Sequence, residues 1–336
     1  MSFANRDFLG LADYAPDEVR FLIGRALDAK RGKRLPSLAG KTLAAIFFNP
    51  SLRTRLSFQI AMDRLGGRAI LVNAGSEVWA IEYGDGAVMD GDTSEHVKEA
   101  ARVLDRYVDA LAIRAFPQFK SWDRDREDVV IRSFAREAKV PVINMESAIE
   151  HPCQGLADAV TIAERLGETK GRPFCLTWAW HPKALPLAVP HSALLAAAHL
   201  GMEVRLACPP GYEPDPDVLG KVKTLAADSG GGFQTFHDQA KAIKGARVVY
   251  AKSWASIARW GDAEAEKAAR KDLRAWQVTG KSMRTTADGF FMHCLPVRRN
   301  VVVADEVLDG PACAVYDEAE NRIWAQMAVL SAVVGR

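Results

Sequence analysis

The sequence of 336 residues lacks the features that mark several common classes of protein. Its five cysteines, at positions 153, 175, 208, 294 and 313, are far apart and form no CxxC pair, which argues against a disulfide framework and against a zinc site. No apolar run reaches the roughly 18 residues of a membrane-spanning helix, and the N-terminus has no apolar signal segment. We therefore expect a cytoplasmic protein that does not bind membranes.

A strong net charge and nucleotide-binding motifs are absent as well. Lys and Arg total 44 against 42 for Asp and Glu, so the net charge of +2 gives no general attraction to nucleic acid. The chain has neither a GxxxxGK[ST] loop nor a GxGxxG turn, and a nucleotide cofactor is not indicated. Any anion that the protein binds must be held by a local cluster of donors.

Short apolar runs alternate with amphipathic segments along the whole chain. In the first part, helical segments separate strands that are predicted over residues 41–48, 66–73, 109–116 and 140–146. The pattern restarts after residue 150, with strands predicted over residues 172–180, 202–209, 245–254 and 289–297. This alternation predicts an α/β fold of two parallel sheets flanked by helices, with a cleft between the two halves.

The segment SLRTR, residues 51–55, is rich in hydrogen-bond donors for a corner between a buried strand and a helix. A helix N-terminus offers free N–H groups and a positive dipole end; Arg53 can add a bidentate clamp, and Ser51 and Thr54 can add hydroxyls. The alternative is an N-cap serine beside arginines in surface salt bridges. The density of donors favours an anion site, with phosphate as the expected anion.

Other polar residues stand at or near the ends of predicted strands, where ligands bind in open parallel sheets. Three of them are Arg114, Glu146 and Lys252. His151 and Gln154 follow the last strand of the first half. They could bind a carbonyl and an amide, or they could merely cap the next helix, and their spacing favours neither interpretation.

Cys294 and Trp79 carry weaker signals. Cys294 follows His293, but neighbours in an extended segment point to opposite faces, so a catalytic Cys–His pair is not expected. Trp79 lies in a loop, where it is either core filler or a projection into a neighbouring subunit. Arg298 and Arg322 add positive charge after the last strand and at the start of the last helix.

The motifs SLRTR, HPCQ and HCLP, in this order and at these distances, resemble those of the carbamoyltransferases that make aspartate or ornithine derivatives. The resemblance extends from about residue 40 to the AENR segment near residue 322. It implies a carbamoyl-phosphate-binding domain over residues 1–150, onto which the C-terminal helix 318–336 packs back, and an acylornithine-binding domain over residues 151–317. It also implies a homotrimer with shared sites, and chemistry that needs no metal and no organic cofactor.

The resemblance also assigns residues to the two substrates. Carbamoyl phosphate is expected to contact Ser51, Leu52 (through its backbone), Arg53, Thr54, Trp79 from the adjacent subunit, Arg114, His151, Gln154, Cys294, Leu295 and Arg322. The acylated amine is expected to contact Ser94, Glu146, His181, Lys252, Leu295 and Arg298. The catalytic residues are expected to be Thr54, Arg114, His151 and Cys294.

Residues 250–262, YAKSWASIARWGD, indicate an acylated acceptor. Ornithine carbamoyltransferases resemble one another in a DxxxSMG stretch, whose aspartate binds the free α-amino group. This segment instead carries Lys252, which suits a carboxylate and not an ammonium group. The chain therefore looks like the N-acylornithine branch, in which the α-nitrogen of the acceptor is masked.

Two positions bear on the identity of the acyl group. In the acetyl type a glutamate follows DGDT and a lysine follows RRNV, where this chain has Ser94 and Val302. Loss of the carboxylate removes both bulk and charge repulsion toward a succinyl group. The segments FNPS and HPCQ instead look like the acetyl type, and His191 replaces an asparagine usual in both types. The balance favours N-succinylornithine, with N-acetylornithine as the alternative.

The predicted reaction transfers the carbamoyl group of carbamoyl phosphate to the δ-amine of N-succinylornithine, giving N-succinylcitrulline and phosphate in arginine biosynthesis. The neutral amine attacks the carbonyl carbon, so the site needs donors at the developing oxyanion and positive charge around the leaving phosphate. Ornithine is a further possible acceptor. The alternative from another class is an inactive relative that binds carbamoyl phosphate as a regulatory protein, and the complete set of anion-binding residues argues against it.

Overall fold

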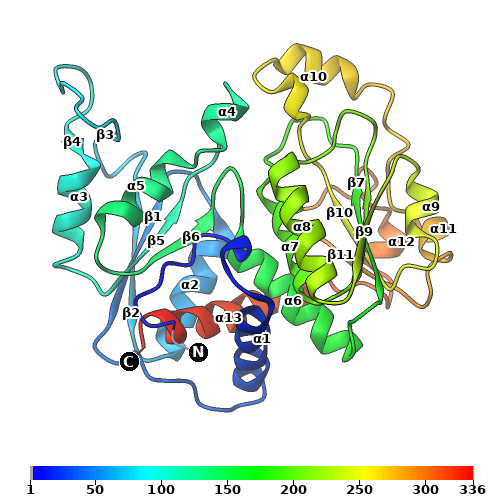
Figure 1. Ribbon diagram of the computed structural model, residues 1–336, viewed down its shortest axis with the longest axis horizontal. Coiled ribbons are helices and arrows are strands. Elements are labelled where there is room, and N and C mark those ends of the chain that lie inside the picture. The colour runs from blue at the N-terminus through cyan, green and yellow to red at the C-terminus, as the bar shows by residue number, and fades with distance from the viewer. Residues whose placement is uncertain (1–2, 336) are drawn as a thin grey trace.

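The computed structural model describes residues 3–335 and contains two main parallel β-sheets with helices packed around them (Figure 1). The four-stranded sheet has the order β2-β1-β5-β6 and is made of β1 (Thr42–Phe47), β2 (Arg68–Asn73), β5 (Ala110–Arg114) and β6 (Val142–Glu146). The five-stranded sheet has the order β11-β10-β7-β8-β9 and is made of β7 (Pro173–Trp178), β8 (Glu203–Ala207), β9 (Gly232–Phe236), β10 (Val248–Lys252) and β11 (Phe290–Met292). The predicted α/β class is confirmed.

Most of the helices connect successive parallel strands, as a parallel sheet requires, whereas α1 precedes the first strand and α12 and α13 follow the last. Around the first sheet they are α1 (Pro16–Lys30), α2 (Leu52–Arg64), α3 (Val97–Leu104), α4 (Trp122–Asp125) and α5 (Val129–Glu137). The rest of the described chain adds α6 (Pro152–Leu166), α7 (Ala188–His199), α8 (Pro216–Asp228), α9 (Gln239–Ile243), α10 (Ala263–Ala269), α11 (Gly280–Met283), α12 (Asp305–Leu308) and α13 (Val315–Val333). Within residues 3–335, none of these helices is long and apolar enough to cross a membrane.

Three strands of the first sheet are buried along their whole length, as expected where helices cover both faces of a parallel sheet. Every residue of β1, β5 and β6 is buried, and β1 and β5 are apolar except for Thr42 and Arg114 at their ends. The edge strand β9 is different, since its sequence GFQTF is only partly buried and has no apolar run. For that reason the sequence did not predict β9.

Two helices begin at residues that matter for the site. Helix α3 begins at Val97, because residues Glu95–His96 form the small strand β4, which pairs with β3 (Ile81–Glu82). Helix α6 begins at Pro152, where proline suits the first turn. This start places Gln154 on α6 itself.

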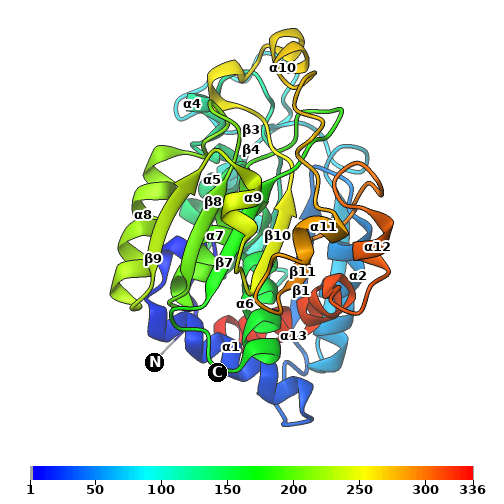
Figure 2. The same ribbon diagram turned by 90° about the vertical axis from the view of Figure 1, so that its right-hand side faces the viewer.

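The chain order brings the site residues together at one edge of each sheet. Strands β1, β5 and β6 are neighbours, so the residues after Phe47, Arg114 and Glu146 all leave the same edge. Helix α13 returns to pack on α1, α2 and α6, which places the start of this last helix beside α2 (Figure 1). Figure 2 shows the five-stranded sheet from its own side, with β9 at one edge and β10 and β11 toward the other.

The apolar core joins the two halves. Its largest cluster of buried side chains contains residues of both, among them Phe58 on α2 and Trp178 at the end of β7. Both side chains have no measurable exposure. The edges of the two sheets that carry the polar residues are therefore held on one continuous scaffold.

Candidate active site

A cavity of about 250 Å³ lies where the carboxyl ends of the strands of the two sheets meet α2, α6 and α13. It contains all of the predicted site residues except Leu52, Trp79 and Ser94. Those that line it are Ser51, Arg53, Thr54, Arg114, Glu146, His151, Gln154, His181, Lys252, Cys294, Leu295, Arg298 and Arg322. The fold thus brings together residues that are separated by more than half of the sequence.

The corner at residues 51–55 both caps a helix and lines the cavity. Ser51 is the N-cap of α2, and its Oγ accepts a hydrogen bond of 3.2 Å from the backbone N–H of Thr54. The buried Oγ1 of Thr54 accepts a hydrogen bond of 2.8 Å from Nη2 of Arg322 on α13. Of the two arginines in this segment, only Arg53 lines the cavity, because Arg55 bonds to Asn73 outside it.

Positive charge dominates the end of the cavity beside α2 and α13. Arg53, Arg114 and Arg322 all line it, and Arg114 forms an ion pair with Glu146. Burial lowers the pKa of Arg322 below its ordinary value, which means that the charged form lacks sufficient compensation from its surroundings. Within the described residues the Nε atoms of Arg53 and Arg322 have no hydrogen-bond partner. An anionic ligand would supply both the charge and the acceptors.

His151 is neutral in this environment. Burial lowers its pKa well below the usual value, and the nearby charges of Arg322 and Arg114 lower it further. Its Nε2 lies 3.6 Å from Oε2 of Glu146, and its Nδ1 has no partner among the residues that the structure describes. A neutral imidazole can donate one hydrogen bond to a carbonyl oxygen without adding a positive charge.

Glu146 occupies an unusual backbone conformation. Its φ is +156°, within the range that favours glycine, and the pairing of β5 with β6 shifts register between Ile113 and Arg114, opposite this residue. The backbone N–H of Glu146 donates a 2.9 Å hydrogen bond to Oδ1 of Asn144. Strained backbone of this kind is often found at binding sites. Here it accompanies a carboxylate that is buried beside Arg114.

The amide of Gln154 is oriented by two buried carboxyl groups. Its Nε2 donates hydrogen bonds of 2.8 Å to Oδ1 of Asp158 and 2.9 Å to Oε1 of Glu318. Glu318 also accepts a bond of 2.9 Å from the backbone N–H of His293, and Tyr250 Oη lies 3.3 Å from its Oε1. Because Nε2 is occupied, the unpartnered Oε1 of Gln154 is left as an acceptor for a ligand.

This carboxyl pair was missed by the sequence analysis. Burial raises the pKa of Asp158 to about 7, and burial together with the Asp158 charge raises that of Glu318 well above its usual value. The pair therefore retains a proton near neutral pH. A signal was present, since Glu318 lies one helical turn before Arg322 in the last helix, and both are buried.

Cys294 lines the cavity as a protonated thiol. Burial raises its pKa above the usual value. The neighbouring His293 cannot act as its base, because burial lowers the pKa of His293 and its Nδ1 accepts a 2.9 Å hydrogen bond from the backbone N–H of Leu295. The next peptide bond, between Leu295 and Pro296, is cis. The thiol is thus available as a weak hydrogen-bond donor and not as a nucleophile.

The other end of the cavity is more exposed and combines basic with apolar side chains. Arg298 Nε donates a 3.0 Å hydrogen bond to Nε2 of His181, and Lys252 ends strand β10. Burial, with the nearby charges of Arg298 and Lys252, lowers the pKa of His181. Apolar residues that were not assigned to a substrate complete the lining: Phe116, Leu185, Pro186, Val189, Pro296 and Val302.

Three predicted residues lie outside this cavity. The side chain of Leu52 is exposed, and only a backbone role was predicted for it. Trp79 is 59% exposed and donates a 2.7 Å hydrogen bond from Nε1 to Glu95, so it is not core filler. Ser94 is exposed on the same segment, where its N–H donates to the carbonyl of Ala80 at 3.1 Å. That a neighbouring subunit receives Trp79 stays a prediction.

A larger hollow of about 820 Å³ lies along the first sheet, between the β3 segment and helices α4 and α5. It shares Phe116 with the smaller cavity, but it contains none of the donors from residues 51–54, α6 or α13. Its charged lining is mixed, with Asp125 and Glu127 beside Lys120 and Arg124. We therefore assign the chemistry to the smaller cavity.

Comparison with protein families decides the class. Residues 6–164 match the family model described as aspartate/ornithine carbamoyltransferase, carbamoyl-P binding domain, and residues 187–333 match the model described as aspartate/ornithine carbamoyltransferase, Asp/Orn binding domain. The chain belongs to the aspartate/ornithine carbamoyltransferase family. This confirms the predicted carbamoyltransferase class.

Known relatives extend over nearly the whole length of this carbamoyltransferase. The N-acetylornithine carbamoyltransferase of Xanthomonas campestris pv. campestris is 46% identical over 334 residues, which is 98% of each chain. A crystal structure of acetylornithine transcarbamylase complexed with acetylcitrulline has a TM-score of 0.96 at 46% identity and covers 98% of this chain and 100% of that one. These names support the acetyl alternative better than the succinyl acceptor that the sequence favoured.

One further solved structure is relevant to the acyl group. It is an N-acetyl-L-ornithine transcarbamylase variant with a glutamate replaced by serine, complexed with carbamyl phosphate and N-succinyl-L-norvaline. Its TM-score is 0.95 at 46% identity, and the match covers 98% of this chain and 99% of that one.

Proposed function

We propose that the protein transfers the carbamoyl group of carbamoyl phosphate to the δ-amine of an N-acylornithine, with N-acetylornithine as the acceptor. The observation that carries the proposal is the convergence of Arg53, Arg114 and Arg322 with the oriented amide of Gln154 and a neutral His151 in one cavity. An acyl phosphate whose acyl part is a planar carbamoyl group would satisfy all of these groups. The relatives named N-acetylornithine carbamoyltransferases, 43–46% identical, support the acceptor.

In the proposed complex the phosphate lies at the N-terminus of α2. The free N–H groups of that helix, the hydroxyl of Ser51 and the guanidinium groups of Arg53 and Arg322 would hold it. The backbone N–H of Leu52 belongs to the same first turn. These donors also stabilise the charge that builds up on phosphate as it leaves.

The carbamoyl group lies deeper, toward α6. Thr54, Arg114 and His151 would donate to its carbonyl oxygen, and Oε1 of Gln154 would accept from its NH₂ group. Donors that are already in place before reaction stabilise the oxyanion without reorganisation. The Asp158–Glu318 pair supports this arrangement by fixing which end of the Gln154 amide faces the ligand.

The acceptor enters from the more exposed end. Lys252 and Arg298 would bind its carboxylate. His181 and Glu146 would contact its acylated nitrogen and side chain. The segment at Cys294 and Leu295 would contact its δ-amine.

The lone pair of the neutral amine attacks the carbamoyl carbon, a C–N bond forms and the C–O bond to phosphate breaks. The amine loses one proton, and in the overall balance the released phosphate gains it. Positioning of the two substrates supplies much of the acceleration.

We further propose that residues 1–150 with the C-terminal helix 318–336 form the carbamoyl-phosphate-binding domain and residues 151–317 the acceptor-binding domain. We propose a homotrimer in which Trp79 and Ser94 complete the site of a neighbouring subunit. Their exposure on one segment, outside the cavity of their own chain, supports this arrangement.

N-succinylornithine is the second candidate acceptor. It is favoured by Ser94 and Val302, which stand where the acetyl type has a glutamate and a lysine, since the smaller serine removes a carboxylate that would repel a succinyl group. The solved glutamate-to-serine variant of an N-acetyl-L-ornithine transcarbamylase with N-succinyl-L-norvaline is in line with this argument.

The deciding experiment uses radiolabelled carbamoyl phosphate with N-acetylornithine, N-succinylornithine, ornithine or no amine in parallel reactions. The highest kcat/KM is expected with N-acetylornithine. A higher value with N-succinylornithine would move the assignment to the second candidate, and turnover of ornithine alone would overturn the N-acyl proposal. Binding of carbamoyl phosphate without turnover of any amine would identify an inactive relative.

A further inference from the structure

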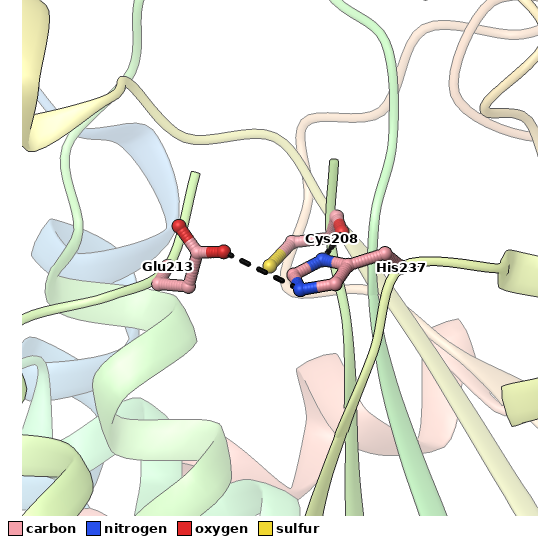
Figure 3. Close-up of side chains that lie close together, drawn as sticks. All are labelled: Cys208, Glu213 and His237. Atoms are coloured by element: carbon pink, nitrogen blue, oxygen red, sulfur yellow. Dashed lines mark hydrogen bonds and ion pairs between the residues drawn. The ribbon is translucent and has the colours of Figure 1, made fainter. Parts of the chain in front are cut away.

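A second cluster of reactive side chains lies in the five-stranded sheet, away from the catalytic cavity. Cys208 directly follows β8, His237 directly follows β9, and Glu213 lies in the loop between β8 and α8 (Figure 3). The two strands are neighbours, and the backbone N–H of Cys208 donates a 3.1 Å hydrogen bond to the carbonyl of Phe236. One ligand atom from each of the three side chains lies within 4.8 Å of the other two.

Backbone hydrogen bonds orient two of these side chains toward a common point. Nδ1 of His237 donates a 3.0 Å hydrogen bond to the carbonyl of Cys208, which leaves Nε2 free. Oε2 of Glu213 accepts a 2.8 Å bond from the N–H of Gly211, and its other oxygen, Oε1, lies 3.7 Å from Nε2 of His237. Outer hydrogen bonds of this kind fix the tautomer and direction of metal-binding histidines and carboxylates.

The hydrogen bond of His237 Nδ1 also decides which atom of the ring faces the cluster. Because Nδ1 donates to the carbonyl of Cys208, Nε2 is the ring atom that faces Oε1 of Glu213, 3.7 Å away, and one metal ion can bridge the two. The buried sulfur of Cys208 completes the third side. A metal ion at this point would use all three groups.

We propose that Cys208, Glu213 and His237 bind one divalent ion of intermediate softness, with Zn²⁺ the best match, and that a water molecule fills the fourth position. One sulfur, one imidazole nitrogen and one carboxylate oxygen form a ligand set typical of tetrahedral zinc. Bond lengths of about 2.0–2.3 Å place the ligand atoms of such a site roughly 3.3–3.8 Å apart. The 3.7 Å between Nε2 of His237 and Oε1 of Glu213 lies within this range, and all three ligand atoms lie within 4.8 Å of one another. Thiolate is the form that binds, so the thiol proton passes to solvent when the ion enters.

The metal would hold the loop between β8 and α8 against the sheet. This loop already accepts two side-chain hydrogen bonds from the segment that follows Lys252: Trp254 Nε1 donates to the carbonyl of Tyr212 at 2.7 Å, and Ser256 Oγ donates to that of Gly211 at 2.6 Å. The site would thus be structural and lies within the acceptor half, and none of its three ligands lines the catalytic cavity. The wide spacing of the cysteines argued against a zinc site. Cysteine spacing does not reveal a site of this kind, because its three ligands are of different types and come from segments that only the fold brings together.

The test is a titration of the metal-free, full-length protein with Co²⁺, followed by displacement with Zn²⁺. We expect one ion per chain, the d–d absorption of tetrahedral cobalt and a thiolate-to-cobalt charge-transfer band. Cys208→Ser removes the charge-transfer band. His237→Gln and Glu213→Gln, which change partly exposed side chains that the fold tolerates, weaken Zn²⁺ binding by about tenfold or more.

Cys294→Ser and Cys313→Ser are the matched controls, and both should retain the cobalt spectrum with unchanged stoichiometry. A rise in Tm on addition of Zn²⁺ to the wild type should be lost in His237→Gln. The proposal is overturned if the wild type gives no tetrahedral cobalt spectrum, which would leave a His–Glu ion pair beside a buried thiol. It is equally overturned if the charge-transfer band survives in Cys208→Ser and disappears in Cys294→Ser.

Discussion

The two ends of the catalytic cavity are built differently. At the end assigned to carbamoyl phosphate, Thr54, His151 and Gln154 are at most 3% exposed. At the acceptor end, His181 and Lys252 are only partly buried, and Arg298 is exposed. The first end is held by hydrogen bonds that connect α2, α6 and α13, whereas the second end depends on side chains that project from loops and one strand terminus.

The difference in burial suggests a division of roles, with the chemical step at the buried end and the choice of acceptor at the exposed end. A buried, preorganised set of donors suits the step that every family member must perform, the loss of phosphate from a carbamoyl group. An exposed set can be changed by single substitutions without loss of the core, so it suits discrimination between acceptors. Each prediction below tests one end against the other.

The largest effect is expected from Arg322→Leu, at the buried end. Removal of a preorganised positive charge beside the leaving phosphate should lower kcat/KM with N-acetylornithine by about 10²–10³-fold. Arg299→Leu is the control, because Arg299 is exposed and pairs with Asp305 and Asp309 outside the cavity. Folded Arg322→Leu protein with activity close to that of the control would contradict the assignment of the phosphate.

Glu318→Gln should have the next largest effect. An amide offers one acceptor oxygen where the carboxyl group has two, so the donors from Gln154 and His293 can no longer both be satisfied. We expect kcat to fall by about tenfold or more while the KM for N-acetylornithine changes little, since the carbamoyl group is misplaced. Glu320→Gln, on the exposed side of α13, is the control. A rise in acceptor KM at constant kcat would contradict a positioning role.

Lys252→Met tests the acceptor end. Loss of the ammonium group should raise the KM for N-acetylornithine by about tenfold, because a carboxylate loses a charged partner, and should change the KM for carbamoyl phosphate much less. Lys267→Met on exposed α10 is the control for loss of a surface lysine. If the KM for carbamoyl phosphate rises as much as that for the acceptor, the two ends are not independent.

The smallest effect is expected from Ser94→Glu, which should also be the most selective. The added carboxylate should lower kcat/KM for N-succinylornithine by about fivefold or more and leave the value for N-acetylornithine nearly unchanged. Thr224→Glu adds the same charge on an exposed position of α8. Equal losses with both acceptors would refute the placement of Ser94 near the acyl group.

The sequence was sufficient for the fold class and for most residues of the cavity. Buried parallel strands leave continuous apolar runs, and polar residues after such runs must lie at one edge of the sheet, which located Arg53, Arg114 and Lys252. The motifs SLRTR, HPCQ and HCLP then indicated that these residues belong to one site. The edge strand β9 left no such run, and its absence from the prediction follows from its exposed face.

Contacts between distant segments could not be predicted. The pairing of Asp158 with Glu318 depends on how α13 packs against α6, and the cluster of Cys208, Glu213 and His237 depends on the neighbouring positions of β8 and β9. Local sequence also did not show that Arg55 turns away to Asn73 while its neighbour faces the cavity. Each of these outcomes is decided by packing geometry, which a pattern along one chain does not contain.

The central claim is that carbamoyl phosphate occupies the buried end and the acceptor the exposed end. A crystal structure with carbamoyl phosphate and N-acetyl-L-norvaline, which lacks the δ-amine and cannot react, tests it directly. We predict the phosphate between Arg53 and Arg322, the carbamoyl NH₂ within hydrogen-bond distance of Oε1 of Gln154, and the norvaline carboxylate at Lys252. Phosphate bound at Lys252 and Arg298, or either ligand bound outside this cavity, would contradict the account.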